Sequence, residues 1–372
     1  DYEMIKNNHY HSSSLTSQER THTSQENTVK IRSHDKRSIN YIIRSFIAGG
    51  AAGCVAKSVI APFDRVKILF QASNPHFQKY AGRIRQLEFN FKPFLIGSWT
   101  GVFQATRRIY MDDGPKGLFQ GHSATLIRIF PYAAIKFVAY EQFRHILIPS
   151  RKYETSMRIL LSGSLAGVTS VLFTYPLELI RVRLAYEVRG DNRIGFKSIC
   201  RQVYHESAAS HRRYFHFPLM NFYRGLLPTI MGMIPYAGVS FWTHYILSEF
   251  SRKMWPEHTT RPSLVAGKLD SQGQERRAPL KTWVELGVGG VAGAVSQTAA
   301  YPFEVIRRRM QVHGAFDPSN FVGIWQTTKT IWNASGFKGF FVGLSIGYLK
   351  VTPMVAVSFT VYNRMKLLLN ID

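Results

Sequence analysis

A six-residue pattern occurs three times along this chain and constrains its fold more than any other feature. Each copy reads proline, any residue, an acid, two further residues and a base. The three copies are Pro62–Lys67, Pro176–Arg181 and Pro302–Arg307. A Gly-x-x-x-Gly pair begins 13 residues before each proline, at Gly49, Gly163 and Gly289. Repetition at constant offsets predicts three copies of one supersecondary unit.

A second shared block follows each copy of the pattern. In this block a glycine is followed by a proline after 10 residues and by a phenylalanine after 6 more. The blocks run from Gly121 to Phe137, from Gly225 to Phe241 and from Gly343 to Phe359. Two insertions, at residues 88–101 and 207–221, lie between the two kinds of block. Each repeat therefore has two constant parts joined by a variable loop.

The constant parts lie in long apolar stretches. The first, residues 41–63, is almost wholly apolar or small, and a helix of that length spans the roughly 30 Å hydrocarbon core of a bilayer. Its Gly49-x-x-x-Gly53 pair would let another helix approach closely. Similar stretches follow at about 122–148, 155–187, 225–250, 280–312 and 343–369. We expect an all-α membrane protein with six transmembrane helices in three pseudo-symmetric repeats; a buried helix in a soluble protein is the alternative for the first stretch.

These boundaries divide the chain into a tail, three repeats and a linker. The tail, residues 1–38, is polar, so we expect it to be disordered. The repeats cover residues 39–150, 151–252 and 281–372, and a flexible linker, on the side of the membrane opposite the loops within the repeats, covers 253–280. Short amphipathic stretches predict helices that lie on a membrane surface. These stretches are Phe103–Met111, Phe196–His205 and Phe321–Trp332.

The charge of the chain points to anionic partners. The formal net charge is +24, which favours polyanions or anionic lipid surfaces. Nucleic acid is excluded, because the basic residues are spread over loops that membrane-length apolar runs interrupt. Neither the two cysteines nor the 13 histidines have metal-ligand spacing, so no metal is expected. The sequence contains no Walker loop, and its Gly-x-x-x-Gly pairs lie inside apolar helices, so we expect no enzyme.

Charges inside the apolar stretches need partners. An ionised side chain costs about 2.5–3.5 kcal/mol at mid-bilayer on insertion scales, so the acids and bases of the repeated pattern should face the interior and pair. Three acids and three bases at equal depth can close a ring. The alternative pairs each acid with the base three positions later in its own helix, but such a pair contributes only a few tenths of a kcal/mol.

The three repeats resemble the mitochondrial carrier family over about residues 41–369. That family's signature is Pro-x-acid-x-x-base, followed by acid-Gly and aromatic-base-Gly. Copy one closes with Asp113-Gly114 and Phe119-Gln120-Gly121, copy two with Tyr223-Arg224-Gly225, and copy three with Ser335-Gly336 and Phe341-Val342-Gly343. The departures are Gln120 and Val342 in place of the base, Ser335 in place of the acid, and an acid-Gly that is missing from copy two.

The resemblance implies two gates. The matrix gate would pair Asp64 with Arg181, Glu178 with Arg307, and Glu304 with Lys67. Gln71 and Gln311 would brace it, while Ala185 leaves the third brace absent. The cytosolic gate would join Glu141 to Ser248, Tyr245 to Lys366, and Asn363 to Arg144. Because the cytosolic gate contains no ion pair, we expect it to be weak and the resting carrier to be open mainly to the cytosolic side.

The resemblance also implies a substrate. As in carriers of adenine nucleotides, bases would neutralise phosphates, and a Gly-aliphatic pair followed by an aromatic residue would hold adenine. The bases are Lys57, Arg128, Lys136 and Lys350, and the adenine residues are Gly232, Met233 and Tyr236. Structural pairing of the bases and plain helix packing of Gly232 and Met233 are the alternatives. The stretch Arg128–Gln142 and the insertion near 88–101 look most like the coenzyme A carriers grouped with the Graves disease carrier.

The expected function is transport of coenzyme A, or a related adenosine 3′,5′-diphosphate compound, across the mitochondrial inner membrane by alternating access. The protein would be a monomer that crosses the membrane several times, with both termini in the intermembrane space. Its partners would be a small anionic substrate and membrane lipid. No cofactor is expected, although cardiolipin could bind. An ADP/ATP-type exchanger is the first alternative, and a proton-leak or non-transporting protein of the same fold is the second.

Overall fold

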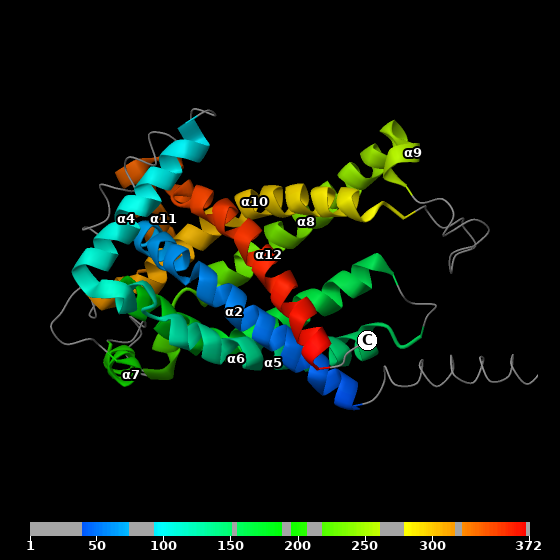
Figure 1. Ribbon diagram of the computed structural model, residues 1–372. Helices are drawn as coiled ribbons and strands as arrows, with labels where there is room; N and C mark the ends of the chain where they lie inside the picture. Colours follow the sequence, from blue (N-terminus) through cyan, green and yellow to red (C-terminus); the bar gives the residue numbers. More distant parts are fainter. Residues whose placement is uncertain are drawn as a thin grey trace, which may run out of the picture. The chain divides into compact units, whose positions relative to one another are not determined.

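Six long helices carry the repeated prolines. The computed structural model describes residues 39–73, 93–150, 155–187, 195–206, 218–260, 279–316 and 322–369. The long helices are α2 (Ile39–Gln71), α5 (His122–Leu147), α6 (Ser156–Tyr186), α8 (Leu226–Met254), α10 (Thr282–Phe316) and α12 (Leu344–Leu368), each with its repeat proline inside (Figure 1). The expected all-α fold, with two long helices in each of three repeats, is confirmed.

The helices are long enough to cross a membrane. Three of them also meet the length and composition expected of a span: Ile43–Gln71, Met157–Tyr186 and Phe337–Leu368. The other three, α5, α8 and α10, contain 26, 29 and 35 residues, so each extends about 39 Å or more at 1.5 Å per residue. Large apolar side chains such as Phe173, Ile234 and Leu286 are at least 70% exposed, as expected for groups that face lipid.

The shorter elements lie between the long helices. They are α4 (Pro93–Leu118), α7 (Phe196–His205), the 3₁₀ helix η3 (Pro218–Tyr223), α9 (Pro256–Thr259), α11 (Ile324–Ser335) and the 3₁₀ helix η5 (Phe337–Phe341). Helix α7 has the predicted bounds, and α11 begins three residues after the predicted start. Helix α4 begins ten residues before the predicted Phe103, so part of the 88–101 insertion is helical. Three segments with predictions lie outside the described residues: the tail (1–38), most of the linker (261–278) and part of the second insertion (207–217).

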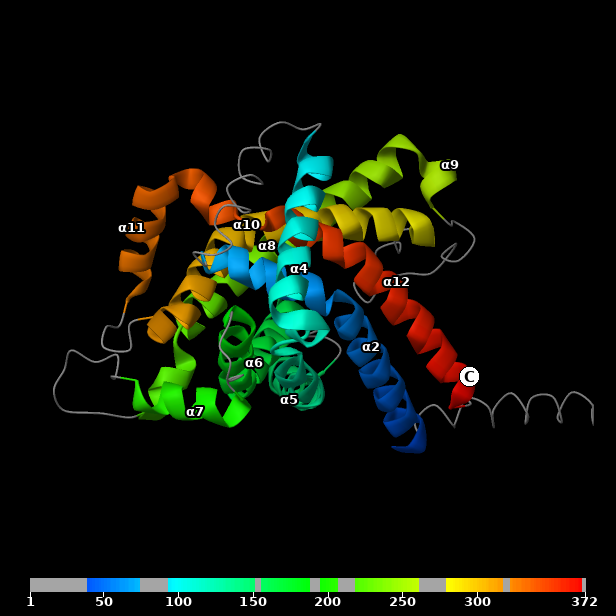
Figure 2. The same cartoon turned by 60° about the vertical axis from the view of Figure 1, so that its left-hand side comes forward.

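The chain divides into two compact units. The first contains residues 1–55 and 356–372, and within it Arg44 Nη1 donates to the carbonyl oxygen of Leu369 at 3.2 Å. The second contains residues 56–355 and holds every acid and base of the repeated pattern. In this second unit α5 packs along α6, and α8 packs along α10, as Figure 2 also shows. In the first two repeats, the second long helix therefore packs against the first long helix of the next repeat.

Two glycines make this packing close. Gly121 and Gly225 precede α5 and α8 with φ values of 80° and 82°, which a residue with a side chain rarely adopts. A Cβ on Gly121 would lie 2.7 Å from the carbonyl oxygen of Arg181, and one on Gly225 would lie 3.1 Å from that of Arg307. The close approach predicted for the Gly49 pair stays a prediction; a Cβ on Gly49 would meet no described atom within 4 Å.

Candidate functional site

The acids of the repeated pattern bind the bases of neighbouring repeats. Arg181 Nη2 lies 3.1 Å from Asp64 Oδ2, Arg307 Nη2 lies 3.0 Å from Glu178 Oε1, and Lys67 Nζ lies 2.8 Å from Glu304 Oε1. These are the three pairs that the family resemblance implies. The contact within one helix, from Arg181 Nη1 to Glu178 Oε2, is longer at 3.8 Å. The main partners of these buried acids are therefore bases on other helices, and not bases on the same helix.

Two bases expected to bind substrate are held by the same acids. Arg128 of α5 pairs with Glu178 Oε2, and Lys350 Nζ of α12 lies 2.7 Å from Asp64 Oδ1. Glu178, whose side chain is 2% exposed, also binds Arg308 Nη1 at 2.8 Å. The sequence analysis missed Arg308. Its signal in the sequence was the run of basic residues that continues beyond Arg307. Arg308 lies six residues after the repeat proline.

The remaining candidate substrate residues differ in their surroundings. Lys57 Nζ lies 3.6 Å from Met354 Sδ and experiences the charges of Asp64, Lys350 and Arg128, so it belongs to the charged cluster. Arg128 also lies over the ring of Tyr132, with 5.6 Å from Cζ to the ring centre. Lys136 is exposed on α5. The charged cluster thus includes three of the four expected bases: Lys57, Arg128 and Lys350.

The proposed adenine residues receive weaker support. A Cβ on Gly232 would lie 3.0 Å from Phe303 Cβ, so this glycine serves the packing of α8 against α10. The expectation that Gly232 provides room for a flat ring stays a prediction. Met233 is half-buried and Tyr236 is 47% exposed, so both keep surface for a ligand.

Glutamines brace two of the three repeat junctions. Gln71 Nε2 donates to Tyr301 Oη, and Gln311 Nε2 donates to Tyr175 Oη, both at 2.9 Å. Each tyrosine directly precedes a repeat proline, a signal that the sequence analysis did not use. At the third junction the corresponding residues are Ala61 and Ala185, so both halves of that brace are alanine.

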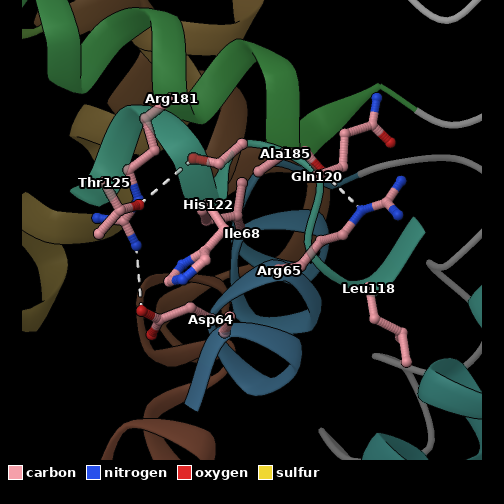
Figure 3. Close-up of a pocket in the computed structure, with 11 residues that line it drawn as sticks. Asp64, Arg65, Ile68, Leu118, Gln120, His122, Thr125, Arg181 and Ala185 are labelled. Atoms are coloured by element: carbon pink, nitrogen blue, oxygen red, sulfur yellow. Dashed lines mark hydrogen bonds and ion pairs between the residues drawn. The ribbon is translucent and has the colours of Figure 1, made fainter. Parts of the chain in front are cut away.

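A pocket occupies the position of the absent brace. It is lined by both alanines and by the Asp64–Arg181 pair (Figure 3). His122 enters it from the start of α5, and its Nε2 lies 2.8 Å from Ser58 Oγ. The pocket therefore lies directly beside one ion pair of the candidate matrix gate.

The acid that appeared to be missing from copy two is Glu206. It follows α7 directly and binds Arg183, whose Nη2 lies 3.0 Å from Glu206 Oε2, while Arg224 Nη1 lies 3.3 Å from the same oxygen. Burial lowers the pKa of Arg224, and Glu206 opposes that effect. The signal was an acid at the end of the predicted amphipathic helix. The family's glycine is replaced by Ser207, and the 207–221 insertion separates this acid from Tyr223-Arg224-Gly225.

The expected cytosolic gate stays a prediction. Glu141 and Arg144 lie on α5, and Tyr245 and Ser248 lie on α8, where Ser248 Oγ is 3.4 Å from His244 Nδ1. The other two members lie on the part of α12 that belongs to the first unit: Asn363 and Lys366.

Comparisons with known proteins match one family over most of this chain. A family model described as "Mitochondrial carrier protein" matches residues 39–151, 153–254 and 278–372. The mitochondrial carrier protein LEU5 of Saccharomyces cerevisiae is 48% identical over 355 residues, which cover 92% of this chain and 94% of that protein. The human solute carrier family 25 member 16 is 39% identical over 330 residues, 88% of each chain. The mitochondrial carrier protein CoAc2 of Zea mays is 37% identical over 336 residues, 88% of this chain and 87% of its own.

Proposed function

Because the chain belongs to the mitochondrial carrier family, we propose that it moves coenzyme A, or a related adenosine 3′,5′-diphosphate compound, across the mitochondrial inner membrane. Members of this family are transporters and not enzymes, and the chain is a multi-pass protein of that membrane. An even number of spans would leave both termini on the same side of the membrane, and we propose that this side is the intermembrane space.

The charged cluster is the observation that carries this proposal. Seven basic side chains surround three acidic ones, which gives a formal excess of four positive charges. Coenzyme A carries a 3′-phosphate and a diphosphate, with about four negative charges when fully ionised. The name of the maize relative, CoAc2, contains the abbreviation of this compound. Met233 and Tyr236 offer apolar surface for the adenine ring.

The bases expected to bind substrate and the bases of the matrix gate share the same acids, and the proposed mechanism follows from this sharing. Arg128 is bound to Glu178, and Lys350 is bound to Asp64, so a phosphate that takes these bases competes with the matrix-gate acids. Each acid that loses a base is left more costly to keep buried. Substrate binding would thus weaken the matrix gate, and binding that favours the open state shifts the population toward it. Alternating access follows from this coupling.

A thermal-shift screen of the purified protein tests the substrate class. The ligands are coenzyme A, dephospho-coenzyme A, adenosine 3′,5′-bisphosphate, ADP and ATP. We expect coenzyme A to raise the unfolding temperature most and dephospho-coenzyme A, which lacks the 3′-phosphate, to raise it less. Stabilisation by ADP and ATP alone would instead indicate the adenine nucleotide exchanger, because the same bases can bind those phosphates.

Arg128→Ala tests the site itself. We expect this variant to lose both the thermal shift and substrate-dependent uptake into liposomes, because Arg128 offers a planar fork of donors to phosphate. Arg252→Ala is the control, since Arg252 lies near the end of α8, with its Nη1 2.9 Å from Glu249 Oε1, and is not a candidate substrate or gate residue. Normal uptake by Arg128→Ala would remove this residue from the substrate site.

A further inference from the structure

One buried arginine in the first repeat has a role that the gate pairs do not explain. Arg65 lies between the gate residues Asp64 and Lys67 on α2, and its side chain is 1% exposed. The corresponding positions of the other repeats hold Leu179 and Val305. Its charge is therefore a feature of the first repeat alone, and burial of a guanidinium requires several partners.

The partners of Arg65 come from two repeats. Within its own repeat, Nη2 lies 3.2 Å from Asp113 Oδ2, and Nη1 donates to the carbonyl oxygen of Gly117. Toward the second repeat, Nε donates to the carbonyl of Ala185 at 3.3 Å, and Nη2 donates to that of Glu187 at 2.7 Å. Figure 3 shows the guanidinium reaching past the pocket to the end of α6.

The carbonyls at the end of α6 suit a cation. The last carbonyls of a helix have no partner within the helix, and that end carries a partial negative charge. Arg65 thus joins the first two repeats at the junction where Ala61 and Ala185 replace the tyrosine and glutamine of a brace.

We propose that Arg65 is the matrix-side lock between the first and second repeats and replaces the brace that this junction lacks. This proposal rests on the proposed matrix gate, since the lock would open when the first and second repeats separate. The bonds to α6 would then break, while Asp113, which belongs to the same repeat, would keep its ion pair with Arg65. The guanidinium is therefore never left buried without an acid, and the lock can re-form.

The next junction supplies a matched comparison. Arg183 of α6 donates to the carbonyl oxygen of Gln311 at 2.8 Å and pairs with Glu206 of its own repeat. Gln311 and Ala185 occupy equivalent positions, nine residues after their prolines. This junction already has a brace, formed by Gln311 and Tyr175. A brace introduced at the first junction should therefore replace Arg65 and should not replace Arg183.

Restoration of the brace tests the lock. Ala61→Tyr and Ala185→Gln would together place the missing pair in the pocket. Without any substrate, we expect Arg65→Ala to lower the unfolding temperature by about 5 °C and the two brace substitutions to restore most of this loss, although neither should do so alone. They should not rescue Arg183→Ala. Failure of the pair to rescue Arg65→Ala, or equal rescue of Arg183→Ala, would overturn the proposal.

Accessibility separates a lock from a purely structural residue. Gln120 lines the same pocket, so Gln120→Cys, in a chain with Cys54 and Cys200 changed to serine, reports opening toward the matrix. In the milder Arg65→Lys variant, labelling by a membrane-impermeant maleimide should rise about fivefold or more from the matrix side and stay unchanged from the other side. Equal labelling of Arg65→Lys and its parent would contradict the lock. Because neither experiment uses a substrate, a wrong substrate assignment would leave both results intact.

Discussion

Glu178 is the acid that binds the largest number of bases in the charged cluster, as the described residues show it. Arg128, Arg307 and Arg308 all bind its carboxylate, which is almost fully buried. A buried acid with three guanidinium partners holds together α5, α6 and α10, and its removal would leave three cations with less compensation. Glu304, in contrast, has a single ion pair among the described residues, with Lys67.

Glu178→Gln should therefore destabilise the protein more than Glu304→Gln. Both changes keep the shape of the side chain and remove its charge. Loss of one partner from a buried pair typically costs about 3–5 kcal/mol, and we expect Glu178→Gln to reach at least that range. Thermal unfolding of the two variants in the same detergent measures the difference. Equal unfolding temperatures would show that the extra arginines do not contribute.

At the scale of elements, the repeated glycines and prolines set how the helices meet. The prolines lie inside helices that continue beyond them, which brings the gate acids and bases into helical positions. Gly225 begins α8 in a left-handed conformation, with Tyr175 Oη only 3.0 Å from the place of a Cβ. Helices α5 and α8 can approach the gate bases because Gly121 and Gly225 have no side chain.

Gly225→Ala should thus lower the unfolding temperature, because the new methyl group would combine backbone strain with a close contact. Gly163→Ala provides the control. Gly163 lies inside α6, where a Cβ would meet no described atom within 4 Å. Alanine also favours a helix by about 1 kcal/mol relative to glycine. We expect Gly163→Ala to be neutral or slightly stabilising. A loss of stability for Gly163→Ala as large as that for Gly225→Ala would refute this explanation.

Constant spacing and buried charge were enough to predict the helices and an inward-facing ring of acids and bases, while the family resemblance implied which acid meets which base. It was not enough for features that depend on one repeat alone. Glu206 was missed because its glycine is absent and an insertion follows it. Arg65 and Arg308 were missed because neither position recurs as a base in all three copies. The contact of Gly232 with Phe303 could not be predicted from the sequence, because it depends on how α8 packs on α10.

At the scale of the whole molecule, the three junctions between repeats are held in different ways. The second–third junction has a brace, a gate pair and Arg183, while the third–first junction has a brace and the Lys67–Glu304 pair. The first–second junction has a gate pair and Arg65 in place of a brace. If these contacts form the matrix gate, opening of the gate must break a different set of contacts at each junction. No ion pair is expected in the cytosolic gate.

The central claim is that one charged cluster both closes the matrix gate and binds coenzyme A. Uptake of labelled coenzyme A into liposomes that contain the purified protein tests this claim most directly. We predict saturable uptake that adenosine 3′,5′-bisphosphate inhibits and that Arg128→Ala abolishes, with Arg252→Ala unaffected. Saturable uptake of ADP or ATP without uptake of coenzyme A, or full uptake of coenzyme A by Arg128→Ala, would contradict it.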